Sequence, residues 1–130
     1  MTVAIACVIV FLVLTHGLRV FAIRGAAAQF GRYDNNHPRR QQLQLEGAPA
    51  RAQAAHQNGL EAFAPFAAAV LTAQIYSDLD LWRDGLAVAF VLIRIGYFLA
   101  YLKDWSTPRS LLWSAGFFVT IALFCLPLSG

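Results

Sequence analysis

Hydrophobic and polar positions divide the chain into four apolar runs separated by polar segments. The runs cover residues 3–23, about 53–76, about 85–102 and 110–129, and the first and last are almost uninterrupted. An α-helix rises about 1.5 Å per residue, so about 20 apolar residues cross the ~30 Å hydrocarbon core of a bilayer. The pattern therefore predicts four transmembrane helices, at about 3–28, 52–76, 83–103 and 109–129.

Composition supports a membrane protein over a soluble domain. Hydrophobic residues make up 58% of the chain and charged residues only 13%, whereas a soluble domain carries about 25% charged residues. Four spans account for most of the 130 residues. We therefore expect an all-α integral membrane protein, with residues 1–130 forming a single four-helix transmembrane domain.

The positive charges are concentrated in two of the three connecting segments. The first and third segments hold seven cations, and the second holds only Arg83, beside three aspartates; the seven are Arg24, Arg32, Arg39, Arg40, Arg51, Lys103 and Arg109. Cytoplasmic loops carry such an excess of Lys and Arg. The basic loops are thus predicted to be cytoplasmic and both termini to lie on the other side. Attraction to anionic lipid headgroups explains most of this charge, and we expect no nucleic-acid partner.

Polar side chains interrupt the two middle runs at helical spacing. Arg51, Asn58 and Glu61 share one narrow stripe of the second predicted helix, and Arg94, Tyr97 and Tyr101 line one side of the third. A charge at the bilayer centre costs roughly 2.5–3.5 kcal/mol on insertion scales. We therefore expect Glu61 and Arg94 to face each other or a neighbouring subunit, because pairing neutralises both charges.

These polar groups have two interpretations. Glu61 and Arg94 alone could be a buried ion pair that fixes helix packing. The full set also includes Arg19 on the first helix and Arg109 at the start of the fourth, and several arginines aimed at one pocket form a clamp for carboxylates. For the set as a whole, a ligand site is favoured. No metal site is expected, since the three histidines are scattered and no CxxC motif exists.

The second helix resembles the signature of a known family. Arg51 is followed by A-H-x-N-x-x-E at residues 55–61 and then by Pro65-Phe66. This pattern resembles membrane-associated proteins in eicosanoid and glutathione metabolism, the MAPEG family, which includes microsomal glutathione transferases and prostaglandin-E synthase. The resemblance extends over essentially the whole chain, and the segment YDNNHPR at residues 33–39 is similar to the loop of bacterial members. It implies a bacterial inner-membrane location.

The resemblance implies a homotrimer of four-helix subunits, with glutathione as cosubstrate bound between neighbouring subunits. Asn58 and Glu61 match glutathione-contacting positions of the family, and Arg51 and Tyr97 lie beside them on the same helix faces. Arg19, Arg94 and Tyr101 match further positions on the first and third helices. Arg109 and Ser110 match an Arg-Ser pair proposed to stabilise the glutathione thiolate, so Arg109, Ser110 and Tyr101 are the candidate catalytic residues. Two family arginines are replaced here by Ala54 and Gln57, and a family histidine by Tyr97.

Three candidate functions are considered for this sequence. The resemblance implies a glutathione transferase or peroxidase that acts on lipophilic electrophiles or lipid hydroperoxides. The loss of cations at positions 54 and 57 instead favours a non-catalytic lipid-binding or scaffold protein. A small four-helix multidrug transporter has a similar length, but its essential carboxylate lies in the first helix, where this chain has no acid.

Overall fold

A computed structural model describes residues 2–128, and these form a helical bundle. The elements are α1 (Val3–Phe30), α2 (Pro38–Gln42), α3 (Gly47–Tyr76), α4 (Asp80–Leu102), α5 (Ser106–Cys125) and a 3₁₀ turn, η1 (Leu126–Leu128). Four segments are long and apolar enough to cross a membrane: α1, α3, α4, and α5 together with η1. The predicted all-α fold with four long apolar helices is confirmed. The homotrimer stays a prediction.

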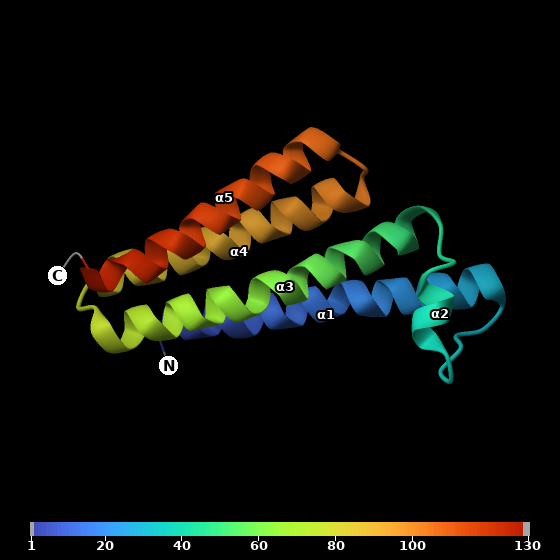
Figure 1. Cartoon of the computed structure of the whole chain (residues 1–130), viewed down its shortest axis with the longest axis horizontal. Coiled ribbons are helices and arrows are strands. Elements are labelled where there is room, and N and C mark those ends of the chain that lie inside the picture. The colour runs from blue at the N-terminus through green and yellow to red at the C-terminus, as the bar shows by residue number, and fades with distance from the viewer. Residues whose placement is uncertain (1, 129–130) are drawn as a thin grey trace.

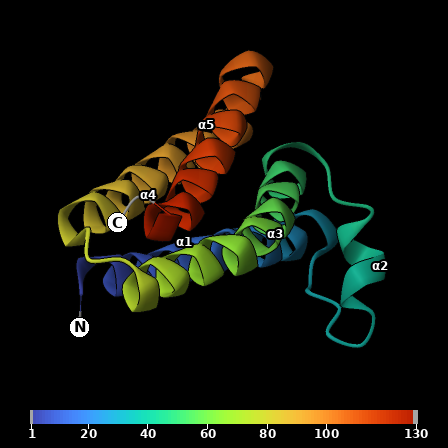
Figure 2. The same ribbon diagram turned by 60° about the vertical axis from the view of Figure 1, so that its left-hand side comes forward.

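The four long helices pack as two hairpins. Figures 1 and 2 show α1 beside α3 and α4 beside α5. The two hairpins meet at the end that holds the first turn of α1 and the last turn of α5, and their axes diverge toward the other end. The short α2 lies at that other end, across the direction of the bundle. The diverging end is therefore the one predicted to be cytoplasmic.

Several helices extend beyond the apolar runs from which they were predicted. α3 begins at Gly47 rather than about 52, α4 at Asp80 rather than about 83 and α5 at Ser106 rather than about 109. A Cβ placed on Gly25 of α1 would lie 2.2 Å from Pro49 Cγ, so α1 and α3 are already in close contact in the first turn of α3. Hydropathy locates the part of a helix that crosses lipid, whereas the helix itself continues wherever packing supports it.

Aromatic rings fill the centre of the bundle, where both hairpins meet. Phe66 of α3 stacks on Phe90 of α4 with centroids 3.8 Å apart, and Phe11 of α1 meets Phe90 edge-on at 5.1 Å. Small residues let the α1 and α3 backbones approach, because Gly59 lies directly against Thr15. The resulting aromatic core packs the two hairpins against each other.

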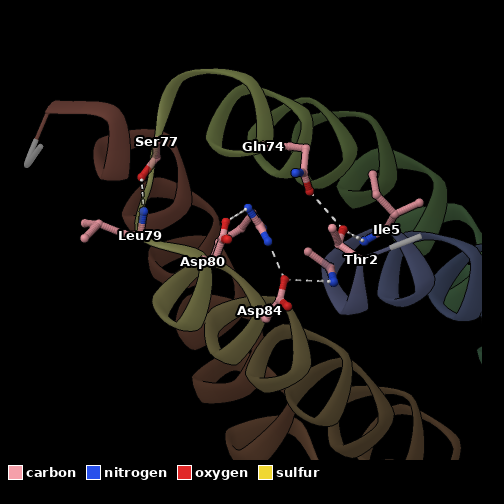
Figure 3. Close-up of polar contacts among 9 residues, drawn as sticks. Thr2, Ile5, Gln74, Ser77, Leu79, Asp80 and Asp84 are labelled. Atoms are coloured by element: carbon pink, nitrogen blue, oxygen red, sulfur yellow. Dashed lines mark hydrogen bonds and ion pairs between the residues drawn. The ribbon is translucent and has the colours of Figure 1, made fainter.

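A polar cluster ties three helices together at the converging end (Figure 3). Arg83 is 2% exposed and forms ion pairs with Asp80 and Asp84. The Asp84 carboxylate also accepts a bond from the Ala4 N–H in the first turn of α1, at 3.2 Å. Thr2 donates to Gln74 near the end of α3, at 2.9 Å. The bond from the Ala4 N–H satisfies a group that the start of α1 leaves unpaired. Together, these contacts join α1, α3 and α4.

Candidate functional site

Arg94 of α4 is the most deeply buried charged residue of the predicted site. Its side chain is 2% exposed, and Nη2 donates to Asn58 Oδ1 on α3 at 2.7 Å. The guanidinium lies over the rings of Tyr97 at 4.2 Å, Phe98 at 5.2 Å and Phe11 at 5.5 Å. Cation–π attraction and a charge-assisted hydrogen bond offset the cost of burying the charge. Nε is buried and lacks a partner in the described chain, so one donor of the guanidinium is unsatisfied.

The predicted ion pair between Glu61 and Arg94 within one chain is wrong. Arg94 bonds instead to Asn58, one turn before Glu61 on α3, and the three ion pairs among residues 2–128 do not involve Glu61. The two side chains share a helix stripe, and the neutral amide is the one within reach of the guanidinium. A partner for Glu61 in a neighbouring subunit stays a prediction.

Pro65 adds a second acceptor near Glu61. Proline has no N–H, so at position 65 inside α3 it leaves the carbonyl of residue i−4 without its helical hydrogen bond. That carbonyl belongs to Glu61. The exposed Glu61 carboxylate and this unpaired carbonyl therefore lie on one turn of α3, and both can accept hydrogen bonds from a cationic or N–H group.

A cavity of about 210 Å³ opens between α3, α4 and α5 beside these residues. Asn58, Glu61 and Arg94 form its polar wall. Its other lining residues are Ala62, Pro65, Phe90, Trp113, Gly116, Phe117, Thr120, Ile121 and Phe124. Most of these side chains are apolar, so the cavity suits a lipophilic group with one polar end.

A second cavity, of about 290 Å³, lies between the end of α4 and the start of α5. It is lined by Tyr97, Tyr101, Arg109, Ser110, Trp113 and Ser114. The Arg109 guanidinium lies 4.6 Å from the centre of the Tyr101 ring and makes no hydrogen bond or ion pair with the described residues. Arg109 is thus a cation whose donors are free to bind an anion. Trp113 lines both cavities, so they are neighbours.

Seven of the nine predicted site residues line these two cavities; they are Asn58, Glu61, Arg94, Tyr97, Tyr101, Arg109 and Ser110. Arg51 and Arg19 have partners elsewhere in the chain. Arg51 Nε donates to the Leu102 carbonyl at the end of α4, at 3.0 Å. Arg19 donates to Gln53 and to the Tyr33 hydroxyl, at 3.1 and 3.2 Å. Within one subunit, both arginines connect helices and loops.

The apolar residues of α5 were not anticipated from the sequence. Trp113, Phe117, Ile121 and Phe124 recur every three or four residues and form one wall of the first cavity. The same spacing is expected of a helix face turned to lipid. Gly116 and Thr120, small residues on that face, were the available signal, because they leave space beside Arg94 and Phe90.

Comparison with known proteins gives a single result. The model of the MAPEG family matches residues 2–129, nearly the whole chain. No curated protein and no solved structure matches the chain. The match agrees with four long apolar helices in the described chain. This protein is an integral membrane protein that belongs to the MAPEG family.

Proposed function

We propose that the protein is a membrane-bound glutathione-dependent transferase or peroxidase that acts on lipophilic electrophiles or lipid hydroperoxides. One observation carries the proposal: a polar cavity with an unpaired cation, Arg109, adjoins an apolar cavity, and Trp113 lines both. A hydrophilic thiol and a lipid-soluble second substrate need such a pair of neighbouring environments. Family membership supports this reading.

Arg109 has the chemistry to activate a thiol. A thiol with an unperturbed pKa near 8.5 is mostly protonated at neutral pH, and the thiolate is the nucleophile. A guanidinium within hydrogen-bonding reach favours the thiolate, so the proton passes to water. The hydroxyls of Ser110 and Tyr101 line the same cavity and supply further donors. We therefore assign Arg109, Ser110 and Tyr101 to the sulfur.

Two reactions follow from a thiolate at this position. In conjugation, a C–S bond forms at the electrophilic carbon and the bond to the leaving group breaks. In peroxide reduction, the thiolate attacks the outer oxygen, the O–O bond breaks, and the alkoxide takes a proton from water. The resulting sulfenic acid then condenses with a second glutathione to give a disulfide and water.

The remaining predicted residues are assigned to the rest of glutathione. Asn58, Glu61, Arg94 and Tyr97 offer amide, carboxylate, guanidinium and hydroxyl groups along the cavities. Glu61 suits the ammonium of glutathione, and the Arg94 guanidinium, which lines the first cavity, suits a carboxylate. Arg19 and Arg51 line neither cavity of their own chain, so they can contribute only to a site that a neighbouring subunit brings beside them. The proposed site therefore lies between subunits of a homotrimer.

An assay with glutathione and an aryl halide tests the role of Arg109. Arg109→Ala should slow turnover about 10- to 150-fold, the effect of losing a charge-assisted hydrogen bond worth about 1.5–3 kcal/mol. The contact is to the ionised sulfur, so the loss should appear in kcat more than in KM. Arg109→Lys is the matched control, because lysine serves equally well as an interfacial anchor.

The outcomes separate three cases. A slow Arg109→Ala variant with an unchanged KM supports the assignment. Equal rates for wild type, Arg109→Ala and Arg109→Lys exclude a catalytic role for Arg109. A wild-type rate that does not exceed the uncatalysed rate with several electrophiles overturns the enzyme proposal.

A non-catalytic lipid-binding or scaffold protein of the same fold is the second candidate. The observation that favours it is the shortage of free cations: residues 54 and 57 are Ala and Gln, and Arg19 and Arg51 already have partners. Glutathione carries two carboxylates, each of which needs a donor. A measurement of glutathione binding to the detergent-solubilised protein, without a second substrate, separates the two candidates. A lipid-binding or scaffold protein should bind no glutathione.

A further inference from the structure

The exposed face of α2 combines one leucine with two arginines. At about 100° per residue, Leu43 falls between Arg39 and Arg40 on one face, and Gln41 points to the opposite side. Leu43, the C-cap of α2, is 88% exposed, and both arginines are exposed, whereas Gln41 is buried. Neither arginine side chain makes a hydrogen bond or ion pair with residues 2–128. The face is therefore unpartnered in its own chain.

The loop around α2 is held in a defined conformation. Gln41 Nε2 donates to the Arg32 carbonyl and Gln41 Oε1 accepts from the Asp34 N–H, each at 2.9 Å. The Asp34 carboxylate accepts from the N–H groups of His37 and Asn36, and the bond from His37 most strongly lowers the pKa of the carboxyl. These bonds hold α2 in one orientation relative to the loop. The face that carries Arg39, Arg40 and Leu43 therefore has a defined direction.

The length of α1 indicates that α2 lies outside the hydrocarbon core of a bilayer. α1 has 28 residues and is about 42 Å long, whereas the hydrocarbon core is about 30 Å thick. The last turns of α1 therefore extend past the core. The chain directly after α2 is attached there, since Leu45 packs on Ala22 and Ala26 and Gln29 Nε2 donates to the Glu46 carbonyl at 2.8 Å. Figure 1 shows α2 lying across the bundle, as a helix in the membrane plane lies.

We propose that α2 is a docking element for anionic phospholipids of the membrane in which the protein is embedded. Arg39 and Arg40 bind headgroup phosphates, and Leu43 inserts between them at the boundary of the acyl chains. A short helix with an apolar residue flanked by cations has the chemistry of an interfacial anchor. Anionic headgroups attract such cations, and the attraction falls off within a Debye length.

Backbone hydrogen exchange of residues 39–44 measures the docking directly. The full chain is placed in nanodiscs of phosphatidylcholine alone or of phosphatidylcholine with phosphatidylglycerol. Exchange should be about tenfold slower with phosphatidylglycerol, because each arginine near the surface favours the docked state. High salt should remove the difference. Equal exchange in both lipids overturns the proposal, as does slowing by a soluble polyanion but not by phosphatidylglycerol.

Substitutions test the face itself. The double variant Arg39→Gln, Arg40→Gln should lose the lipid-dependent difference, and Leu43→Ser should reduce it. Arg32→Gln is the matched control, since Arg32 is an exposed cation of the same loop outside α2, and it should keep the difference. The assignment to this face is overturned if Arg32→Gln loses the lipid-dependent difference in hydrogen exchange. It is also overturned if Leu43→Ser leaves that difference unaltered. Unchanged exchange in α1, α3, α4 and α5 verifies folding.

Discussion

At the residue scale, Arg94 shows why a charge can persist inside this bundle. Two partners of different kinds hold it: the Asn58 amide oxygen and the surrounding rings of Phe11, Tyr97 and Phe98. The sequence predicted that Asn58, Glu61 and Arg94 belong together, and they line one cavity. The sequence did not identify whether Asn58 or Glu61 bonds to Arg94. Helical spacing shows which side chains share a face of α3, but not which of them comes within hydrogen-bonding distance of Arg94.

An ion pair between Glu61 and Arg94 would make Glu61→Ala the more damaging substitution, whereas the observed Arg94–Asn58 bond predicts that Asn58→Ala is. Asn58→Ala removes the acceptor of a charge-assisted bond and should lower stability by about 1.5–3 kcal/mol. Glu61→Ala removes a carboxylate without a partner in its own chain, so it should change subunit stability little. Thermal unfolding of both variants in the same detergent checks the order. A larger loss for Glu61→Ala would show that Glu61 has a partner in another subunit.

At the element scale, long apolar helices were predictable and short or polar ones were not. The four spans follow from uninterrupted hydrophobicity over about 20 residues. α2 has the sequence PRRQQ and carries no periodic signal, and the Gln41 side chain attaches it to the preceding loop at Arg32 and Asp34. Arg51 lies on the predicted stripe, yet its Nε reaches the last turn of α4, a contact that depends on how the hairpins pack.

Gly59 tests the close approach of α1 and α3. A Cβ at this position would lie 2.6 Å from Thr15 Cγ2 and 2.8 Å from its Oγ1, and Thr15 is fully buried. The short, branched side chain of Thr15 has little freedom to move, so Gly59→Ala should destabilise by about 1–3 kcal/mol through overpacking. Gly85→Ala on α4 is the control, because nothing lies within 4 Å of its added Cβ. Equal unfolding midpoints for both variants would contradict a tight helix contact.

At the scale of the whole molecule, the two ends of the bundle have different roles. The Arg83 cluster joins three helices at the converging end. The cavity that holds Arg109 lies between the end of α4 and the start of α5, near the opposite end. The cations expected to be cytoplasmic gather there as well. A hydrophilic cosubstrate from the cytoplasm would thus reach Arg109 without crossing the apolar part of the bundle.

Assembly into a trimer would give partners to polar groups that a single subunit leaves unsatisfied. The Glu61 carboxylate and the Arg109 guanidinium have no hydrogen-bond or ion-pair partner in the described chain, and the donor Nε of Arg94 also has none. An isolated subunit would leave the exposed Glu61 carboxylate beside lipid, and a charge at the bilayer centre costs roughly 2.5–3.5 kcal/mol. We expect each open side to be covered by a neighbouring copy, with α1 and α3 of one subunit facing α5 of the next.

Native mass spectrometry and cross-linking in a mild detergent test this arrangement. The expected species has three times the 14.3 kDa subunit mass and persists on dilution, because assembly satisfies groups that the monomer leaves unpaired. The same sample in a denaturing detergent is the control and should contain monomers. A mild-detergent sample with only monomers and dimers would contradict the trimer. Arg19 and Arg51 would then have no route to the cavities, because both bond to other parts of their own chain, and the proposed glutathione site would have to be built by one subunit alone.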